Sequence, residues 1–323
     1  MRILAIETSC DETSVAVVEN GRKVLSNVIA SQIAKHKITG GVVPEVAARE
    51  HIVAMIPVLR QAMEEAAVTW KDIDAIAVTK EPGLVGSLTV GRMTAAGLAF
   101  ALDKPLFPVH HVHGHMVSNW LGDGPEPEFP VLILTVSGGH NELVLMRGHG
   151  QFEVLAESLD DSAGEAFDKV ARLLGLGYPG GPAIEERARL GNAHAVKFPI
   201  ALRKEKNFSF SGLKTSVFYY LKKHEAELAR DEFVNDVAAS FQESVVQALV
   251  EKLIRAVEDL DVKEVHLTGG VAANCCLRER IAKELGRIAN APRFRFPEKM
   301  DYCTDNAAMI GAAAYFENRA KFR

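Results

Sequence analysis

Two stretches of the chain repeat the same order of secondary-structure signals, and this internal repeat limits the possible folds more than any other feature. In the first stretch, the strand pattern Arg2–Glu7 leads through a polar turn into a second strand pattern, Ser14–Glu19. Further along, the strand pattern Val131–Val136, the turn Ser137–Asn141 and the strand pattern Glu142–Met146 repeat this hairpin. A hairpin that occurs twice in one chain predicts two related halves.

A second matched pair of segments follows the hairpins. The strand pattern Ile73–Thr79 leads through a glycine-containing turn into an apolar helix, Leu88–Leu102. The strand pattern Val262–Thr268 leads through Gly269–Gly270 into a helix near Ala273–Leu285. The 323 residues are enough for about two domains. We therefore predict a duplicated, two-lobed α/β fold with a ligand cleft between the lobes.

The best linker between the lobes is the Gly/Pro-rich stretch Gly122–Glu128. We expect an N-terminal lobe of residues 1–122, completed by about residues 301–323, because the C-terminal helix Asn306–Arg319 is predicted to return to it. The C-terminal lobe is expected to span residues 129–300.

Composition excludes several other classes of protein. A hydrophobic content of 48% with 24% charged residues is typical of a globular chain, not a disordered one. The four cysteines form no Cys-x-x-Cys pair, which argues against a zinc ribbon. No apolar run approaches the length of about 18 residues that spans a bilayer, and the first residues lack a signal-peptide pattern, so we expect a cytoplasmic protein. The 37 Lys and Arg against 42 Asp and Glu give a net charge of −5, so an RNA substrate would require a local basic patch or a partner.

Four of the eleven histidines fall within six residues, at His110, His111, His113 and His115. On a helix His111 and His115 share one face, and imidazole is a common ligand for transition metals, so we favour a metal site over a surface histidine cluster. Asp305 is the best third ligand, although it precedes a helix and an N-cap role is the alternative.

A zinc peptidase would carry a Glu beside the first histidine of an H-E-x-x-H motif. Val112 occupies that position, so the peptidase interpretation is weak.

Two glycine turns predict a nucleotide site. Paired glycines expose backbone N–H groups and admit a phosphate, and the first such turn comprises Thr135, Val136, Ser137, Gly138 and Gly139. After the second turn, Asn274 either contacts the ligand or only caps the helix.

Carboxylates near these turns have several possible roles. Asp168 and Glu185 lie near a third turn that contains Gly181, where acidic residues commonly hold ribose hydroxyls. Asp11 and Glu12 in the first hairpin, with Glu7, could hold a metal, position a reacting group or be solvated, and the residues alone do not rank these roles.

A basic and aromatic stretch has two interpretations. Arg203, Lys204 and Lys206 precede Phe208–Lys214, and this mixture either binds RNA or marks a loop packed by its two phenylalanines.

From Ile6–Ser14 to Cys303–Asn306, the chain resembles the TsaD family of tRNA-modifying proteins in its bacterial form. The resemblance implies an actin-like ATPase (ASKHA) fold. It also implies transfer of a threonylcarbamoyl group from threonylcarbamoyl-adenylate to N6 of the adenosine 3′ of the anticodon, in tRNAs that read ANN codons, with release of AMP. Rival classes are a sugar or acetate kinase of the same superfamily, a metallopeptidase and a non-catalytic scaffold.

The resemblance also assigns site residues. It implies one divalent metal, iron in preference to zinc, bound by His111, His115 and Asp305. The residues it implies for adenylate contact are Thr135, Val136, Ser137, Gly138, Gly139, Asp168, Gly181, Glu185 and Asn274. His113 and Asn141 depart from the commoner Glu and Thr of the family, and His113 is a competing metal ligand. We further expect Asp11 or Glu12 to accept the amine proton.

Partners are expected as well. The resemblance implies tRNA as substrate, a heterodimer with a TsaB-type paralogue, a cycle with a TsaE-type ATPase and a separate TsaC-type synthase that makes the adenylate. Helix Val46–Ala67 carries apolar residues on more than one side, which predicts either a dimerisation face or burial within its lobe.

Overall fold

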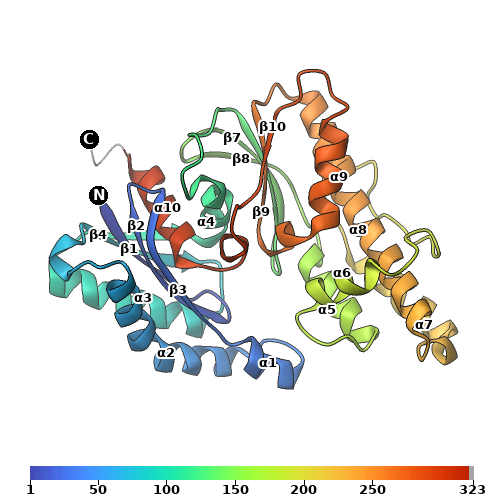
Figure 1. The fold of residues 1–323 in the computed structure, drawn as a ribbon, viewed down its shortest axis with the longest axis horizontal. Helices are drawn as coiled ribbons and strands as arrows, with labels where there is room; N and C mark the ends of the chain where they lie inside the picture. The colour runs from blue at the N-terminus through green and yellow to red at the C-terminus, as the bar shows by residue number, and fades with distance from the viewer. Residues whose placement is uncertain (320–323) are drawn as a thin grey trace. The chain divides into compact units, whose positions relative to one another are not determined.

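The computed structural model describes residues 1–319, and their contacts divide the chain into two compact units (Figure 1). Unit 1 comprises residues 1–127 together with residues 297–319, and unit 2 is Glu128–Phe296. The boundaries expected from the sequence lay at residues 122–129 and near residue 300.

Unit 1 is built on a five-stranded sheet in the order β3-β2-β1-β4-β5. β1 pairs antiparallel with β2 and β2 with β3, whereas β1 pairs in parallel with β4 and β4 with β5. The strands are β1 (Arg2–Glu7), β2 (Glu12–Glu19), β3 (Lys23–Ser31), β4 (Ala75–Glu81) and β5 (Leu106–His110).

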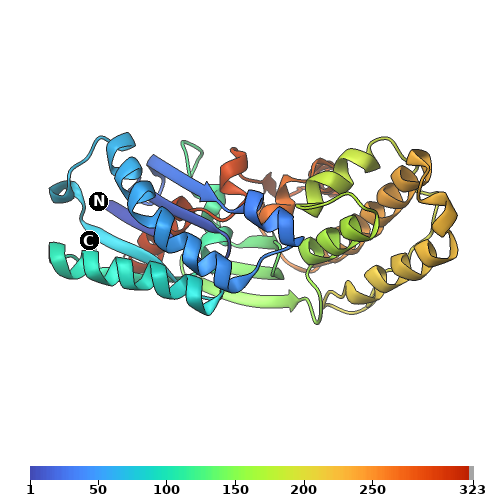
Figure 2. The same cartoon turned by 90° about the horizontal axis from the view of Figure 1, so that it is seen from below.

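Helices cover both faces of this sheet. α2 and α3 run side by side (Figure 2) and bury Leu4, Ile6 and Val15 in one core. α10 packs on the other face, where residues such as Ala5 and Val18 point, because successive side chains of a strand alternate between faces. The helices of unit 1 are α1 (Ile33–Thr39), α2 (Pro44–Glu65), α3 (Val85–Leu102), α4 (His111–Val117) and α10 (Ala307–Asn318).

Unit 2 repeats this plan with a five-stranded sheet in the order β10-β9-β6-β7-β8. The antiparallel pairs β6–β7 and β7–β8 and the parallel pairs β6–β9 and β9–β10 match those of unit 1. The strands are β6 (Val131–Val136), β7 (Asn141–Gly148), β8 (Gln151–Glu157), β9 (Glu264–Thr268) and β10 (Arg293–Arg295). The helices are α5 (Ala163–Leu173), α6 (Gly180–Ala188), α7 (Ser211–Lys223), α8 (Asp231–Asp259) and α9 (Cys275–Leu285).

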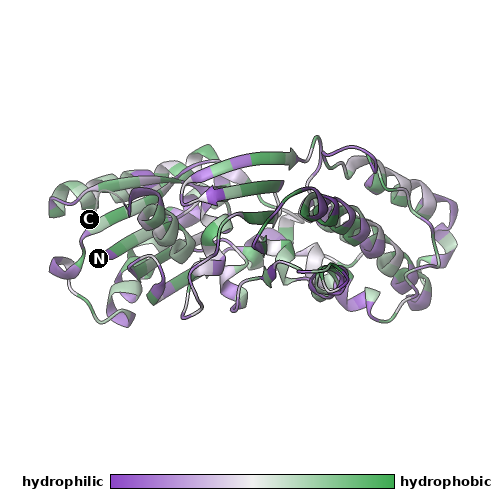
Figure 3. Cartoon of the chain, turned by 90° about the horizontal axis from the view of Figure 1, so that it is seen from above, coloured by the Kyte–Doolittle hydropathy of each residue, from purple (hydrophilic) through white to green (hydrophobic). Residues whose placement is uncertain are grey.

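The two sheets have identical strand orders, so the prediction of a duplicated α/β fold is confirmed. The strands of both sheets are predominantly hydrophobic, as expected where helices cover them (Figure 3). The C-terminal helix belongs to unit 1, as expected. The sequence pattern did not reveal the third strand of each meander, β3 and β8, or the parallel edge strands, β5 and β10.

α2 continues through Pro57 as one helix of 22 residues. The expectation that no apolar stretch is long enough to span a bilayer needs correction. By length and composition alone, α3 passes that test, with a mean hydropathy of 1.3 over 18 residues. In the structure α3 packs against β4 and α2, and many of its apolar side chains remain exposed.

Candidate metal and nucleotide sites

The histidine cluster lies on α4, which packs closely against α10. A Cβ added to Gly114 would lie 2.9 Å from Ile310 Cδ1, so glycine at position 114 allows this close packing without displacement of the isoleucine side chain. The start of α10 is fixed in turn by Ser14 and Asn27, whose oxygens accept the backbone N–H groups of Ala307 and Ala308. The segment just before α10 therefore lies against α4.

This packing brings His111, His115 and Asp305 together. Asp305 Oδ1 lies 3.1 Å from His115 Nε2 and 3.4 Å from His111 Nε2. One potential ligand atom from each residue lies within 4.8 Å of the others, the spacing expected of a metal site. The i, i+4 spacing predicted from the sequence thus places both imidazoles on one face of α4.

Glu7 at the end of β1 contacts His111 on the side of the imidazole that faces away from Asp305. Its Oε2 lies 2.9 Å from His111 Nδ1, and Thr79 donates a hydrogen bond to the same carboxylate. A carboxylate behind a histidine is the usual device that fixes the tautomer and orientation of a metal ligand. Of the roles left open for Glu7, the structure excludes solvation, because this side chain is fully buried.

The electrostatics of the cluster are those of a buried cation between carboxylates. Burial alone lowers the pKa of His111, but the charges of Asp305 and Glu7 oppose it and raise that pKa well above its usual value. Burial likewise raises the pKa of Asp305, and the charge of His111 more than offsets this, so the net shift is downward. The site thus favours two ionised carboxylates around positive charge, which a divalent cation would supply as well as a proton.

The other histidines of the cluster do not join this group. His113 Nδ1 lies 2.7 Å from Glu317 Oε1 on α10, and His113 is absent from the group of close ligand atoms. Burial and the neighbouring His113 lower the pKa of His110 to about 4, so His110 is neutral at pH 7. The structure therefore separates His113 from the residues with which it was expected to compete.

Asp305 does not cap α10. The N-cap is Asn306, whose side chain accepts a hydrogen bond from the N–H of Met309 at 3.0 Å. Since the alternative role of Asp305 is taken by its neighbour, its carboxylate is left for the histidines.

Asp11 and Glu12 follow the turn after β1, in the same unit. Asp11 is buried and Glu12 is half-buried, and Ser31 donates a 3.2 Å hydrogen bond to Glu12. Burial and the nearby charges of Asp11 and Asp305 raise the pKa of Glu12 well above its usual value. A carboxyl group that holds its proton can donate it to a reacting group.

The first glycine turn of unit 2 connects β6 to β7 and leaves its glycines open. Ser137 accepts a hydrogen bond from the N–H of His140 at 3.0 Å, and Thr135 bonds to Thr268 of β9 at 3.0 Å. A Cβ added to Gly138 or Gly139 would meet nothing within 4 Å. The turn thus offers open space beside backbone N–H groups, as phosphate binding requires.

Asp168 on α5 fixes the turn that begins α6. Its Oδ1 accepts the N–H of Gly180 at 2.7 Å. A Cβ on Gly180 would lie 2.5 Å from the Cα of Asp168, whereas one on Gly181 would meet nothing within 4 Å. The turn is therefore packed on the Gly180 side and open at Gly181.

Glu185 and Asn274 meet near the start of α9. Glu185 accepts the N–H of Cys275 at 3.0 Å. Asn274 caps α9 by accepting from Leu277 at 2.9 Å, and its amide donates to Gln242 at 2.8 Å. Of the two roles left open for Asn274, the structure gives it the cap, and its contact with a ligand stays a prediction.

Some important positions were not found from the sequence. Gly164 was not singled out, yet a Cβ there would lie 2.4 Å from the carbonyl oxygen of Ser137. Gly269 was expected only as part of a glycine turn, but it has φ +87°, and a Cβ there would lie 2.5 Å from the carbonyl oxygen of Val136. Only the clustering of glycines hinted at these close approaches. Phe208 and Phe210 are buried, so the packed-loop interpretation of their stretch is correct for these two side chains.

Solved structures with low sequence identity share this fold. HypF of T. kodakarensis superposes with a TM-score of 0.68 at 16% identity, covering 99% of this chain and 48% of HypF. The (R)-2-hydroxyglutaryl-CoA dehydratase component A of Acidaminococcus fermentans gives a TM-score of 0.55 at 15% identity, covering 99% of each chain. The fold is thus the duplicated actin-like ATPase (ASKHA) fold.

Relatives of much higher identity cover nearly the whole chain. The tRNA N6-adenosine threonylcarbamoyltransferase of Clostridium kluyveri is 53% identical over 322 residues, which are 98% of this chain and 92% of the relative. The protein of the same name from Symbiobacterium thermophilum is 51% identical over 325 residues, 99% and 93% of the two chains. Residues 23–312 match the TsaD family, described as tRNA N6-adenosine threonylcarbamoyltransferase. The chain therefore belongs to the TsaD family of tRNA N6-adenosine threonylcarbamoyltransferases.

Proposed function

We propose that this transferase moves a threonylcarbamoyl group from threonylcarbamoyl-adenylate to N6 of the adenosine 3′ of the anticodon, in cytoplasmic tRNAs that read ANN codons, and releases AMP. The observation that carries the proposal is the convergence of His111, His115 and Asp305 in a chain of this family. A sugar or acetate kinase of the same fold has no need of such a cluster, so the cluster favours the transferase over the kinase.

We propose that His111, His115 and Asp305 hold one divalent metal ion, iron in preference to zinc. The fit rests on two imidazole nitrogens that face one carboxylate oxygen and on the carboxylate of Glu7 behind His111. When bound, the ion would supply Lewis-acid and template chemistry, neutralising negative charge on the substrate.

The residues of unit 2 would bind the adenylate. The open turn at Gly138 and Gly139 suits the phosphate, and the carboxylates of Asp168 and Glu185 suit ribose hydroxyls. Asp168 also fixes the turn at Gly180, so it would act both as a contact and as a positioning residue.

The reaction needs no protein nucleophile. The N6 amine attacks the carbamoyl carbon, the bond from this carbon to the phosphate oxygen breaks, AMP leaves with the electron pair, and the amine loses a proton. Because AMP is a good leaving group, positioning and charge stabilisation matter most. The acceptor for the proton would be the carboxylate of Asp11 or Glu12. The raised pKa of Glu12 favours Asp11 in this role.

A transfer assay tests the proposal. The purified protein, with a TsaB-type paralogue and a TsaE-type ATPase, would receive threonylcarbamoyl-adenylate and unmodified tRNA, and mass spectrometry would identify the nucleosides. Threonylcarbamoyladenosine in the RNA is the expected product. If competent partners and substrate give none, and the protein instead consumes ATP with a small hydroxylated acceptor, the kinase class takes its place.

Asp11→Ala is expected to lower transfer at least about 100-fold, the usual contribution of a positioned proton acceptor. Binding of AMP, measured by calorimetry, should change less than twofold, because the proposed adenylate contacts lie elsewhere in the chain. Glu12→Gln is the matched control and should keep most of the activity. Loss of AMP binding in Asp11→Ala would overturn the assignment of Asp11 as proton acceptor.

We also propose that the outer face of α2 and α3 docks the TsaB-type paralogue. α2 buries Met55 and Leu59 on one side and exposes Ile52 and Ile56 on the other, so burial within the unit accounts for only one face of this helix. α3 adds further exposed apolar side chains, with Phe100 at 91% exposure. An apolar face of this kind is typical of a protein interface.

Ile52→Asp combined with Ile56→Asp is expected to abolish co-elution with the paralogue in size-exclusion chromatography, because each change places a charge in the apolar contact. Val154→Asp on β8 introduces a charge at a similarly exposed apolar position of unit 2, and this variant should still co-elute. Co-elution of the double variant with unchanged affinity would refute the interface.

A further inference from the structure

The segment of residues 197–223 is strongly basic in an acidic chain. It contains seven Lys and Arg residues and one Glu, a formal charge of 7 − 1 = +6, whereas the whole chain carries −5. Such a segment is the local basic patch that an acidic RNA-modifying protein requires.

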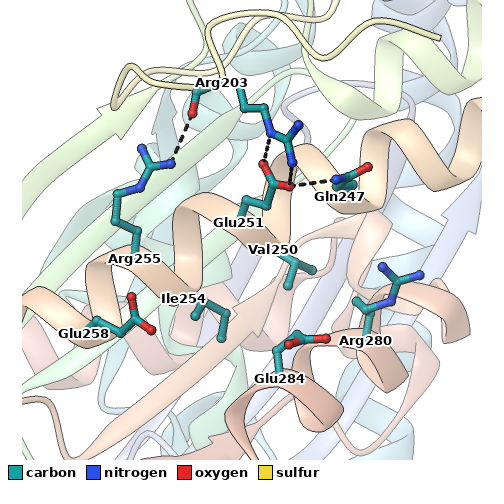
Figure 4. A pocket seen from close by; sticks show the side chains of 9 residues that line it. All are labelled: Arg203, Gln247, Val250, Glu251, Ile254, Arg255, Glu258, Arg280 and Glu284. Atoms are coloured by element: carbon teal, nitrogen blue, oxygen red, sulfur yellow. Dashed lines mark hydrogen bonds and ion pairs between the residues drawn. The ribbon is translucent and has the colours of Figure 1, made fainter. Parts of the chain in front are cut away.

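The first part of this segment is a loop held firmly on α8. Lys252 donates hydrogen bonds to the carbonyl oxygens of Leu202 at 2.6 Å and Glu205 at 2.7 Å. Arg203 pairs with Glu251, and Arg255 donates to the carbonyl of Arg203 at 3.2 Å (Figure 4).

Where this loop contacts α8, charged side chains pair with one another within the protein. Arg203 and Glu251 line a cavity of about 490 Å³, and their charges neutralise each other. By contrast, Lys204 and Lys206 are exposed and form no ion pair within residues 1–319. Positive charge therefore faces solvent in the loop that leads into α7.

α7 continues the segment and divides into two faces. Leu213, Val217 and Leu221 are buried at helical spacing. The opposite side, which we call the α7 outer face, consists of Phe218, Tyr219, Lys222 and Lys223. No acidic residue occurs in α7.

The chemistry of the α7 outer face is that of a surface for single-stranded nucleic acid. Phe218 and Tyr219 are 45% and 58% exposed, and their ring centroids lie 5.5 Å apart. Lys222 and Lys223 follow at i+4 from these rings, so each cation lies one turn from an aromatic side chain. Exposed rings offer stacking to bases, and the neighbouring lysines offer charge to phosphates.

We propose that the α7 outer face binds the tRNA substrate through unpaired nucleotides, with Lys204 and Lys206 adding attraction to the phosphate backbone. This inference rests on the proposed function for the identity of the RNA. A protein partner would be the alternative occupant. Arg203 and Lys214 of this segment pair with Glu251 and Asp161, whereas its other five lysines form no ion pair within residues 1–319. This unpaired positive charge favours RNA, because every RNA carries a uniform density of negative phosphates.

The test uses the full chain with its partners and unmodified tRNA transcript. Lys222→Glu with Lys223→Glu is expected to weaken tRNA binding at least tenfold by fluorescence anisotropy. The slope of log affinity against log salt should fall in magnitude by about 1.4 to 1.8, for two lost phosphate contacts. Phe218→Ala with Tyr219→Ala should also weaken binding about tenfold through lost stacking, with the salt slope unchanged.

Two further variants control for the effects of added acidic residues and of net charge. Lys222→Gln with Lys223→Gln removes the charge without placing acids at the C-terminal end of α7, and it should show the same loss in weaker form. Lys263→Glu with Lys283→Glu changes the net charge equally at exposed positions of the same unit and should bind tRNA as the unaltered protein does.

The outcomes separate this inference from the proposed function. Unchanged tRNA affinity and unchanged KM for tRNA in the α7 variants would overturn the α7 assignment, even if the unaltered protein modifies tRNA. Intact RNA binding with loss of a protein partner would overturn it too. If the α7 variants lose RNA affinity while the unaltered protein forms no threonylcarbamoyladenosine, the α7 face stands and the proposed function fails.

Discussion

His115→Ala is expected to remove the bound metal ion and to lower threonylcarbamoyl transfer at least about 100-fold. The substitution deletes one of three converging ligand groups, and a site with two ligands binds a divalent ion far more weakly; loss of even an outer partner commonly costs about 10- to 100-fold in affinity. The remaining pair, His111 and Asp305, lies 3.4 Å apart and can pair with each other instead. The fold should survive, because the core of unit 1 does not depend on this imidazole.

The measurement is the metal content of the purified protein, by mass spectrometry, together with the transfer rate at fixed added metal. His113→Ala is the matched control, since it removes a histidine of the same helix that bonds to Glu317 and lies outside the ligand group. It should keep both metal and activity. If His115→Ala retains one metal ion per chain, or His113→Ala loses it, the assigned ligand set is wrong.

The sequence was sufficient for the parts of this site that depend on one helix. The spacing of His111 and His115 predicts a shared face wherever the helix forms. Asp305 is different, because its approach to α4 depends on the close packing of α4 on α10 and on the anchoring of α10 by β2 and β3. These are tertiary contacts, so local spacing did not decide between a ligand and a cap, and the resemblance supplied the assignment.

The missed strands have a related explanation. β3 alternates only weakly between buried and half-buried residues, and β8 is mostly exposed. Edge strands of this kind lack the strong hydrophobic pattern that marks a central strand such as β1. The duplication was nevertheless recognisable, since the strands β1, β2, β6 and β7 consist largely of buried residues.

The role of Asn274 in unit 2 could not be decided from the sequence. An Asn between a glycine turn and a helix satisfies the rules for a cap and for a ligand contact alike. The structure shows both its side-chain oxygen and its amide engaged with the protein. The turn geometry around it depends on glycines whose need becomes visible only when the neighbouring backbone is in place.

Gly164→Ala is expected to lower the affinity for the adenylate at least tenfold while unit 2 stays folded. A Cβ at this position would lie 2.4 Å from the carbonyl oxygen of Ser137 and 2.7 Å from the Cα of Gly138, closer than non-bonded atoms allow. These neighbours are backbone atoms, so the turn itself must shift or α5 must move away. Overpacking of this kind costs about 1–3 kcal/mol, and the displaced N–H groups are those proposed to hold the phosphate.

Calorimetric titration with AMP and the KM for threonylcarbamoyl-adenylate measure the effect, and thermal unfolding measures the cost in stability. Gly97→Ala is the matched control: position 97 lies inside α3, nothing lies within 4 Å of an added Cβ, and alanine favours a helix by about 1 kcal/mol over glycine. It should bind AMP normally and unfold no earlier. Normal AMP affinity in a folded Gly164→Ala protein would contradict the assignment of the phosphate to this turn. Loss of AMP affinity in Gly164→Ala but not in Gly97→Ala would support phosphate binding by the glycine turn. The sequence alone indicated this role only weakly, because hairpin turns commonly contain glycine.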